Sequence, residues 1–166
     1  MSSVATATAT NRAADRAAPQ TGVQTLDIRK DIVIHAPLEI VWESLLEQMG
    51  PESEMPDGTK FPRVLEAFPG GRWYRDLGHN AGHFWGHVQV IKPPALLEIC
   101  GPLFMSYPVA SHLQYRLSDE GKGMTKLSLV HQAIGLIDPK HGEGVNKGWE
   151  FMNNHVRRIA EAKAGK

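Results

Sequence analysis

The chain has 166 residues, of which 42% are hydrophobic and 22% are charged, a composition typical of a globular protein with one domain. Its 18 basic and 18 acidic residues balance, which argues against a nucleic-acid binder, because such proteins carry a basic surface. No window reaches the roughly 20 apolar residues that a membrane-spanning helix needs. The single cysteine, Cys100, excludes an internal disulfide, and we expect a reducing, cytoplasmic location.

The first 24 residues differ in composition from the rest. They are rich in Ala, Thr and Ser and contain no aromatic residue, so they cannot bury enough apolar surface to offset the entropy of ordering. They also lack the apolar stretch of a secretory signal, and a transit-type leader is the alternative. We predict a disordered tail over residues 1–24 and a single domain over residues 25–166.

The domain is predicted to begin with a strand and a helix. In "TLDIRKDIVIHAP" (25–37), Leu26, Ile28, Ile32 and Ile34 share one face, which indicates a half-buried strand. Residues 37–49 carry apolar side chains at helical spacing, with a proline at the start and Gly-Pro at the end. A polar loop is expected over residues 50–62.

Six closely spaced strands follow in the prediction, separated by Gly- and Pro-rich turns. They cover residues 63–68, 72–77, 83–91, 95–101, 110–118 and 124–133. Short turns between strands favour an antiparallel meander. From Asp138 onward the apolar spacing becomes that of one long amphipathic helix, with Asp138 as N-cap and Pro139 at the first position.

This order predicts an α+β fold in which a curved antiparallel sheet wraps around a long C-terminal helix and leaves a cavity. Several stretches, in the same order, resemble the START-like (SRPBCC) superfamily with its helix-grip fold. They are "DIVIHAPLEIVWESL", "FPGGRWYRDL", "GHVQVIKPPALLEI" and "NKGWEFMNNHV". The branch that they are most similar to is named for activators of the 90-kDa heat-shock protein ATPase, and the resemblance covers residues 26–163.

The resemblance implies that a hydrophobic small molecule, lipid-like or aromatic, binds in the central cavity without being transformed. One alternative is an enzyme of the polyketide cyclase or aromatase type, with His131 and Tyr115 polarising a carbonyl. Another is a co-chaperone or stress-response protein that binds a protein partner, and a homodimer stays open. No cofactor is expected.

Strand alternation gives the residues expected to line the cavity. On the strand over 83–91, Phe84, Gly86 and Val88 share the more apolar face, while Trp85 lies on the other. The same alternation points His131 and Tyr115 inward, where they could bond each other, a water or a ligand. The predicted ligand-binding residues are Tyr74, Phe84, Val88, Leu113, Tyr115, Leu129, His131, Trp149 and Met152.

Two glycine-rich stretches invite other interpretations. In "GHNAGHFWGH" (78–87) the histidines recur every four residues, as metal ligands on a helix do, but the glycines disfavour a helix. On a strand, His83 and His87 would lie about 13 Å apart, too far to share an ion, so no metal site is predicted. "GEGVNKG" (142–148) lacks the spacing of a phosphate loop and is expected to begin the last helix, with Gly148 close to the sheet.

Overall fold

The structure is a computed structural model that describes residues 22–103 and 106–165. The predicted tail lies almost entirely outside these residues. The helices are α1 (Leu38–Met49) and α2 (Pro139–Lys163). The strands are β1 (Gln24–Ile34), β2 (Val64–Leu65), β3 (Arg72–Gly78), β4 (Ala81–Lys92), β5 (Leu96–Gly101), β6 (Val109–Gly121) and β7 (Met124–Gly135).

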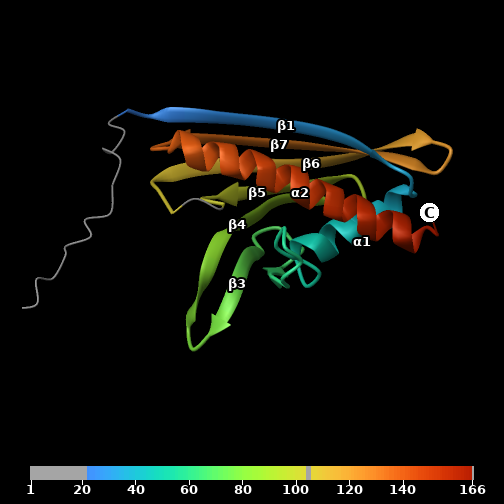
Figure 1. The fold of residues 1–166 in the computed structure, drawn as a ribbon, viewed down its shortest axis with the longest axis horizontal. Coiled ribbons are helices and arrows are strands. Elements are labelled where there is room, and N and C mark those ends of the chain that lie inside the picture. The colour runs from blue at the N-terminus through green and yellow to red at the C-terminus, as the bar shows by residue number, and fades with distance from the viewer. Residues whose placement is uncertain (1–21, 104–105, 166) are drawn as a thin grey trace, which may run out of the picture.

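The strands form one antiparallel sheet in the order β1-β7-β6-β5-β4-β3-β2. After β1, every strand pairs with its neighbour in sequence, which is the predicted meander, and β1 closes the far side by pairing with β7 along its whole length. The sheet is curved, and α2 lies along one face with α1 packed beside its C-terminal half (Figure 1). This is the predicted α+β helix-grip fold.

The N-terminal end of α2 is set by the residues that the sequence indicates. The side chain of Asp138 accepts a hydrogen bond from the backbone N–H of Lys140, and Pro139 occupies the first turn. A side-chain oxygen at this position satisfies a backbone donor that has no partner within the helix. The helix therefore starts where predicted and runs for 25 residues, and none of the described helices is long and apolar enough to cross a membrane.

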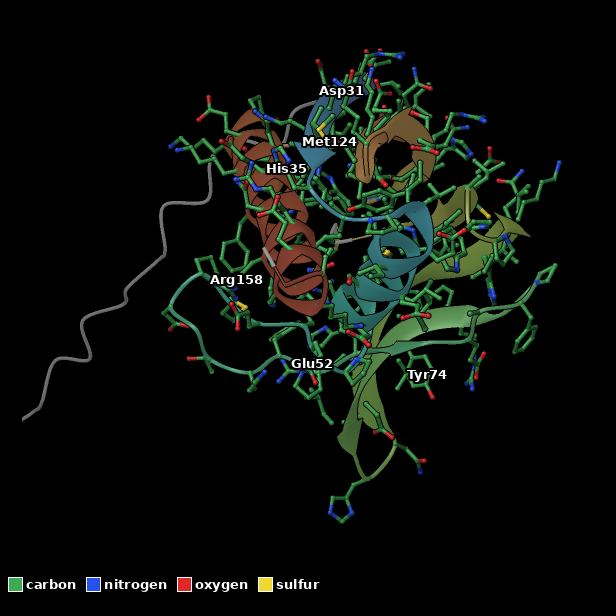
Figure 2. The ribbon with its side chains drawn as sticks, turned by 90° about the vertical axis from the view of Figure 1, so that its right-hand side faces the viewer. Asp31, His35, Glu52, Tyr74, Met124 and Arg158 are labelled. Carbon is green, nitrogen blue, oxygen red and sulfur yellow. The ribbon has the colours of Figure 1, made fainter. Side chains whose placement is uncertain are left out.

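The hydrophobic core lies between the sheet and the two helices. Its largest fully buried side chains come from α1, α2, five strands and, at Leu103, the segment after β5. They include Trp73, Trp149, Tyr115, Leu113 and Leu129. The loop over residues 50–63 is tied to α1 and crosses toward α2, where Glu54 meets Arg158. In Figure 2, Arg158 on α2 and Glu52 on this loop lie on the same side of the molecule.

The β3–β4 hairpin departs from the predicted alternation. Its turn contains only His79 and Asn80, both with positive φ, which is the geometry of a two-residue hairpin turn. Further along, Trp73 pairs with Gly86 whereas Tyr74 pairs with Phe84, so Trp85 is an extra residue on β4. Such a bulge shifts the alternation by one residue. The hairpin bends away from the rest of the sheet (Figure 1).

Candidate functional site

Most of the residues predicted to line a cavity form the solid core instead. Val88, Leu113, Tyr115, Leu129, His131 and Trp149 face the concave side, and each is at most 1% exposed. For the five residues on strands, this inward orientation is the one that strand alternation predicts. They fill the space between the sheet and the middle of α2, so a ligand would have to displace side chains to reach most of them.

His131 is held by α2. The indole Nε1 of Trp149 donates to Nδ1 of His131 over 2.9 Å, with the two rings at 82°. Because an indole N–H only donates, Nδ1 accepts and the proton of the neutral ring lies on Nε2. Burial lowers the pKa of His131 from 6.5 to about 4, since desolvation disfavours the charged form. The imidazole is therefore neutral at physiological pH.

Tyr115 has a different partner on the same helix. Its hydroxyl donates to Oδ1 of Asn153 over 3.1 Å, and burial raises the pKa of the phenol above its usual value of 10. Asn153 follows Trp149 by one helical turn, so the two partners project from one face of α2. A bond between His131 and Tyr115, one of the expected pairings, is replaced by two separate bonds to α2.

Two predicted residues face the wrong way for a central cavity. Phe84 is 44% exposed and packs against His87 on the outer face. Tyr74 is half-buried, lies under the guanidinium of Arg72 and sits on the hairpin away from α2 (Figure 2). The predicted inward orientation was wrong for both, because the bulge at Trp85 reverses the alternation over this part of β4. Trp85, expected outside, is 7% exposed and belongs to the core.

The structure has an apolar pocket at the N-terminal half of α2, displaced from the predicted position. Its volume is about 360 Å³. The lining residues come from the 50–63 loop, β4 and α2: Glu54, Met55, Pro56, Phe61, Arg63, Trp85, His141, Gly144, Val145, Gly148, Phe151 and Met152. Met152 is the one predicted ligand-binding residue among them. The volume and the aromatic lining are those of small-molecule sites.

A wider groove runs along the outside of α2 but suits a hydrophobic ligand less well. It has a volume of about 630 Å³ and lies between β1 and the start of α2. Charged side chains line it, among them Asp27, Arg29, Lys30 and Glu143, and it contains no aromatic residue among its described lining. The smaller pocket is the better candidate because its walls are apolar.

Two helical glycines open the pocket toward solvent. Gly144 and Gly148 lie four residues apart and therefore on one face of α2. A Cβ atom at either position would meet nothing within 4 Å, so the expected close approach of Gly148 to the sheet is not found. Each glycine costs the helix about 1 kcal/mol relative to alanine. At both positions α2 therefore carries no side chain that would narrow the pocket.

Arg63 brings a positive charge to this apolar wall. It is 6% exposed, and its Nε donates to Oγ of Ser53 over 2.8 Å. Its Cζ lies 5.3 Å from the ring centroid of Trp73 and 5.5 Å from that of Trp85, within the range of cation–π attraction. Burial, with a smaller contribution from Arg75, lowers the pKa of Arg63 to about 10, so the guanidinium stays charged at neutral pH.

The mouth of the pocket is polar. Glu54 accepts from Arg158, and this hydrogen bond lowers the pKa of its carboxyl group. Nε2 of His155 lies 3.8 Å from the same carboxylate. At the other end of the pocket, His141 packs edge-on against Tyr107 with 5.3 Å between ring centroids. Glu54 is the one acidic residue among the described residues that line the pocket, and its charge is already matched by Arg158.

The Gly-His repeat that raised the question of a metal site has separate surroundings at each histidine. His79 lies in the hairpin turn, His83 stacks near Trp85, and Nδ1 of His87 is 3.1 Å from the carbonyl oxygen of Gly70. Position 86 needs a glycine because a Cβ atom there would lie 2.6 Å from the carbonyl oxygen of Cys100. Within residues 22–103 and 106–165, no group of three metal-ligating side chains converges.

No model of a known protein family matches the chain, and no curated protein sequence matches it. Solved structures do share its fold. An uncharacterised protein from Rhizobium leguminosarum matches with a TM-score of 0.65 at 18% identity, over 85% of this chain and 97% of its own. CalU16 from Micromonospora echinospora matches with a TM-score of 0.56 at 20% identity, over 86% and 88%.

A third match is StfQ, a di-domain aromatase/cyclase of the steffimycin biosynthetic pathway. Its TM-score is 0.60 at 13% identity, and the match covers 86% of this chain and 52% of StfQ. These identities are low enough that the likeness concerns the fold alone. The matches are consistent with a START-like (SRPBCC-type) fold.

Proposed function

We propose that this protein binds a hydrophobic small molecule in the pocket between α2, β4 and the 50–63 loop. The observation that carries the proposal is the pairing of an aromatic wall, formed by Phe61, Trp85 and Phe151, with the open glycine face of α2. Aromatic side chains contribute large apolar area. A space of about 360 Å³ holds a molecule of up to three aromatic rings or a short acyl chain.

The function is tested with a neutral hydrophobic fluorophore, N-phenyl-1-naphthylamine. We expect saturable binding at one site with enhanced emission, and loss of that binding in Gly148→Leu, because the new side chain extends into the pocket. Lys147→Leu is the matched control, since it adds the same side chain on the exposed face of α2. Equal binding by both variants would show that the dye lies elsewhere and would contradict the proposal.

A second candidate, supported by the shared fold with StfQ, is a cyclase or aromatase-type enzyme that uses His131 and Tyr115. Its support is weaker because both side chains are fully buried, both bond to α2, and neither lines the pocket. An assay for turnover of a polyketide substrate, made on the natural chain and on His131→Gln, distinguishes the two candidates. An enzyme should show turnover that the variant loses, whereas a binding protein should show none in either. A role toward a protein partner, and the branch named for heat-shock ATPase activators, stay predictions.

A further inference from the structure

We propose that the pocket has a movable wall, the small hairpin over residues 54–60, and that the contact between Glu54 and Arg158 limits the size of the ligand that the pocket accepts. The inference rests on the proposed function and concerns the same site. The hairpin contributes Met55 and Pro56 to the lining of the pocket. A shift of the hairpin away from α2 would therefore widen the pocket.

The first support is that the hairpin has its own backbone hydrogen bonds. The N–H of Met55 donates to the carbonyl oxygen of Thr59 over 2.8 Å, and the N–H of Gly58 donates to the carbonyl oxygen of Met55 over 2.9 Å. Glu54 and Lys60 form an isolated antiparallel bridge at the base. Because these bonds are local, the hairpin can keep its shape while its position changes.

The second support is that backbone hydrogen bonds fasten the hairpin to the rest of the molecule at its base. The N–H groups of Ser53 and Arg63 both donate to the carbonyl oxygen of Gly50, over 3.3 and 3.0 Å. Among the residues that the structure describes, no backbone hydrogen bond joins residues 54–60 to α2 or to the sheet. Residues 55–60 are all exposed, so packing in the core does not hold them either. The hairpin is therefore free to pivot about its base.

The third support is the side-chain contact that holds the hairpin against α2. Glu54 accepts a hydrogen bond from Arg158, and Nε2 of His155 lies 3.8 Å from the same carboxylate. His155 and Arg158 are three residues apart, so they lie on one face of α2. The side chain of Arg158 is 63% exposed, and an ion pair with so exposed a partner contributes little to stability. A ligand that gains apolar contacts in a wider pocket can therefore break it.

The test compares two neutral dyes of different size, N-phenyl-1-naphthylamine and the larger Nile red, titrated into the full chain. A dye that fits the pocket as it stands gains nothing when the hairpin moves, whereas a larger dye must break the contact with α2. Arg158→Met is therefore expected to bind Nile red about three- to fivefold more tightly than the natural chain does. Its affinity for N-phenyl-1-naphthylamine should stay the same, since Arg158 does not line the pocket.

Further variants assign the effect to the contact itself. The gain for Nile red in the double variant Glu54→Gln/Arg158→Met should equal the gain in Arg158→Met alone, because both variants break the same contact. Lys163→Met is the matched control. It removes another ion pair of α2, in which Nζ of Lys163 lies 2.7 Å from Oε1 of Glu47 on α1, and neither residue lines the pocket. Binding of both dyes by this control should not change.

The outcomes separate the movable wall from the proposed function. If Arg158→Met strengthens the binding of both dyes equally or of neither, the movable wall is overturned and hydrophobic binding stands. The same holds if Lys163→Met matches the gain in Arg158→Met, because the effect would then come from a general loosening of α2. If neither dye binds to the natural chain at a site that Gly148→Leu abolishes, the proposed function is overturned, and the movable wall falls with it.

Discussion

The indole of Trp149 donates a hydrogen bond to the imidazole of His131, and this bond joins the middle of α2 to strand β7 inside the core. An acceptor nitrogen at Nδ1 requires a ring that is not doubly protonated. The contact therefore exists only while the histidine is neutral. It makes the docking of the helix on the sheet dependent on one protonation state.

This dependence predicts loss of stability in acid. The pKa of His131 in the folded chain, about 4, lies below the usual histidine value of 6.5, so the unfolded chain binds the proton more readily. The contribution of His131 is complete above pH 6.5, decreases as the pH falls toward 4, and amounts to at most about 3 kcal/mol. The free energy of unfolding is measured in urea at pH 7.5 and at pH 4.5. Its decrease between the two pH values should be smaller in His131→Gln than in the natural chain. The exposed His87→Gln variant serves as control, and an unchanged acid loss in His131→Gln would contradict the assignment.

The hydroxyl of Tyr115 is predicted to matter for stability alone. Tyr115→Phe removes the donor to Asn153 and leaves a buried acceptor without its partner, which costs about 1–3 kcal/mol. Chemical denaturation measures this cost, and Tyr107→Phe at the half-exposed tyrosine gives the baseline. Binding of N-phenyl-1-naphthylamine should persist in Tyr115→Phe. Loss of ligand binding with unchanged stability would place Tyr115 in the site after all.

Two glycine-to-alanine substitutions should change the stability of the protein in opposite directions. At Gly86 the added carbon would lie 2.6 Å from the carbonyl oxygen of Cys100 and 2.9 Å from Cγ2 of Ile99, so strands β4 and β5 must separate, at a cost of about 1–3 kcal/mol. At Gly144 the added carbon meets nothing within 4 Å. Alanine should therefore stabilise α2 by up to about 1 kcal/mol. Thermal unfolding of both variants checks the contrast, and a stabilised Gly86→Ala would refute the close approach.

Removal of the N-cap of α2 is predicted to have a smaller effect on stability. Asp138→Ala removes the acceptor for the backbone N–H of Lys140 and should cost about 1 kcal/mol, which lowers the melting temperature by about 2–4 °C for a chain of this length. Asp138→Asn retains a capping oxygen and should lie close to the natural chain. Equal losses in both variants would indicate that the charge, through the helix dipole, matters more than the hydrogen bond.

The sequence was sufficient for the fold because its signals are periodic. Alternation located β1, β6 and β7, and the 3.6-residue spacing with Asp138 and Pro139 located α2. Inward orientation of Tyr115 and His131 followed from the same alternation. Where the period was interrupted, the prediction failed: the bulge at Trp85 is invisible to a rule that counts residues by twos.

The pocket could not be predicted because irregular backbone builds one of its walls. Arg63 and Phe61 come from a loop without periodicity, and only the folded chain brings them to Trp85 and α2. Arg63 was predicted as the first residue of a strand over 63–68, and a charged residue at a strand end is usually solvated, so nothing in the sequence marked it as buried. The glycines at 144 and 148 were noted in the sequence, but Gly148 was predicted to lie close to the sheet, whereas the structure shows open space beside both.

The loop over residues 50–63 contributes residues that line the pocket without belonging to the core. Met55 and Pro56 line the pocket yet contribute little to the core, whereas Leu113, Leu129 and Trp149 hold the sheet and helix together. Substitutions at Met55 or Pro56 therefore reshape this wall of the pocket while the core between the sheet and the helices keeps its packing.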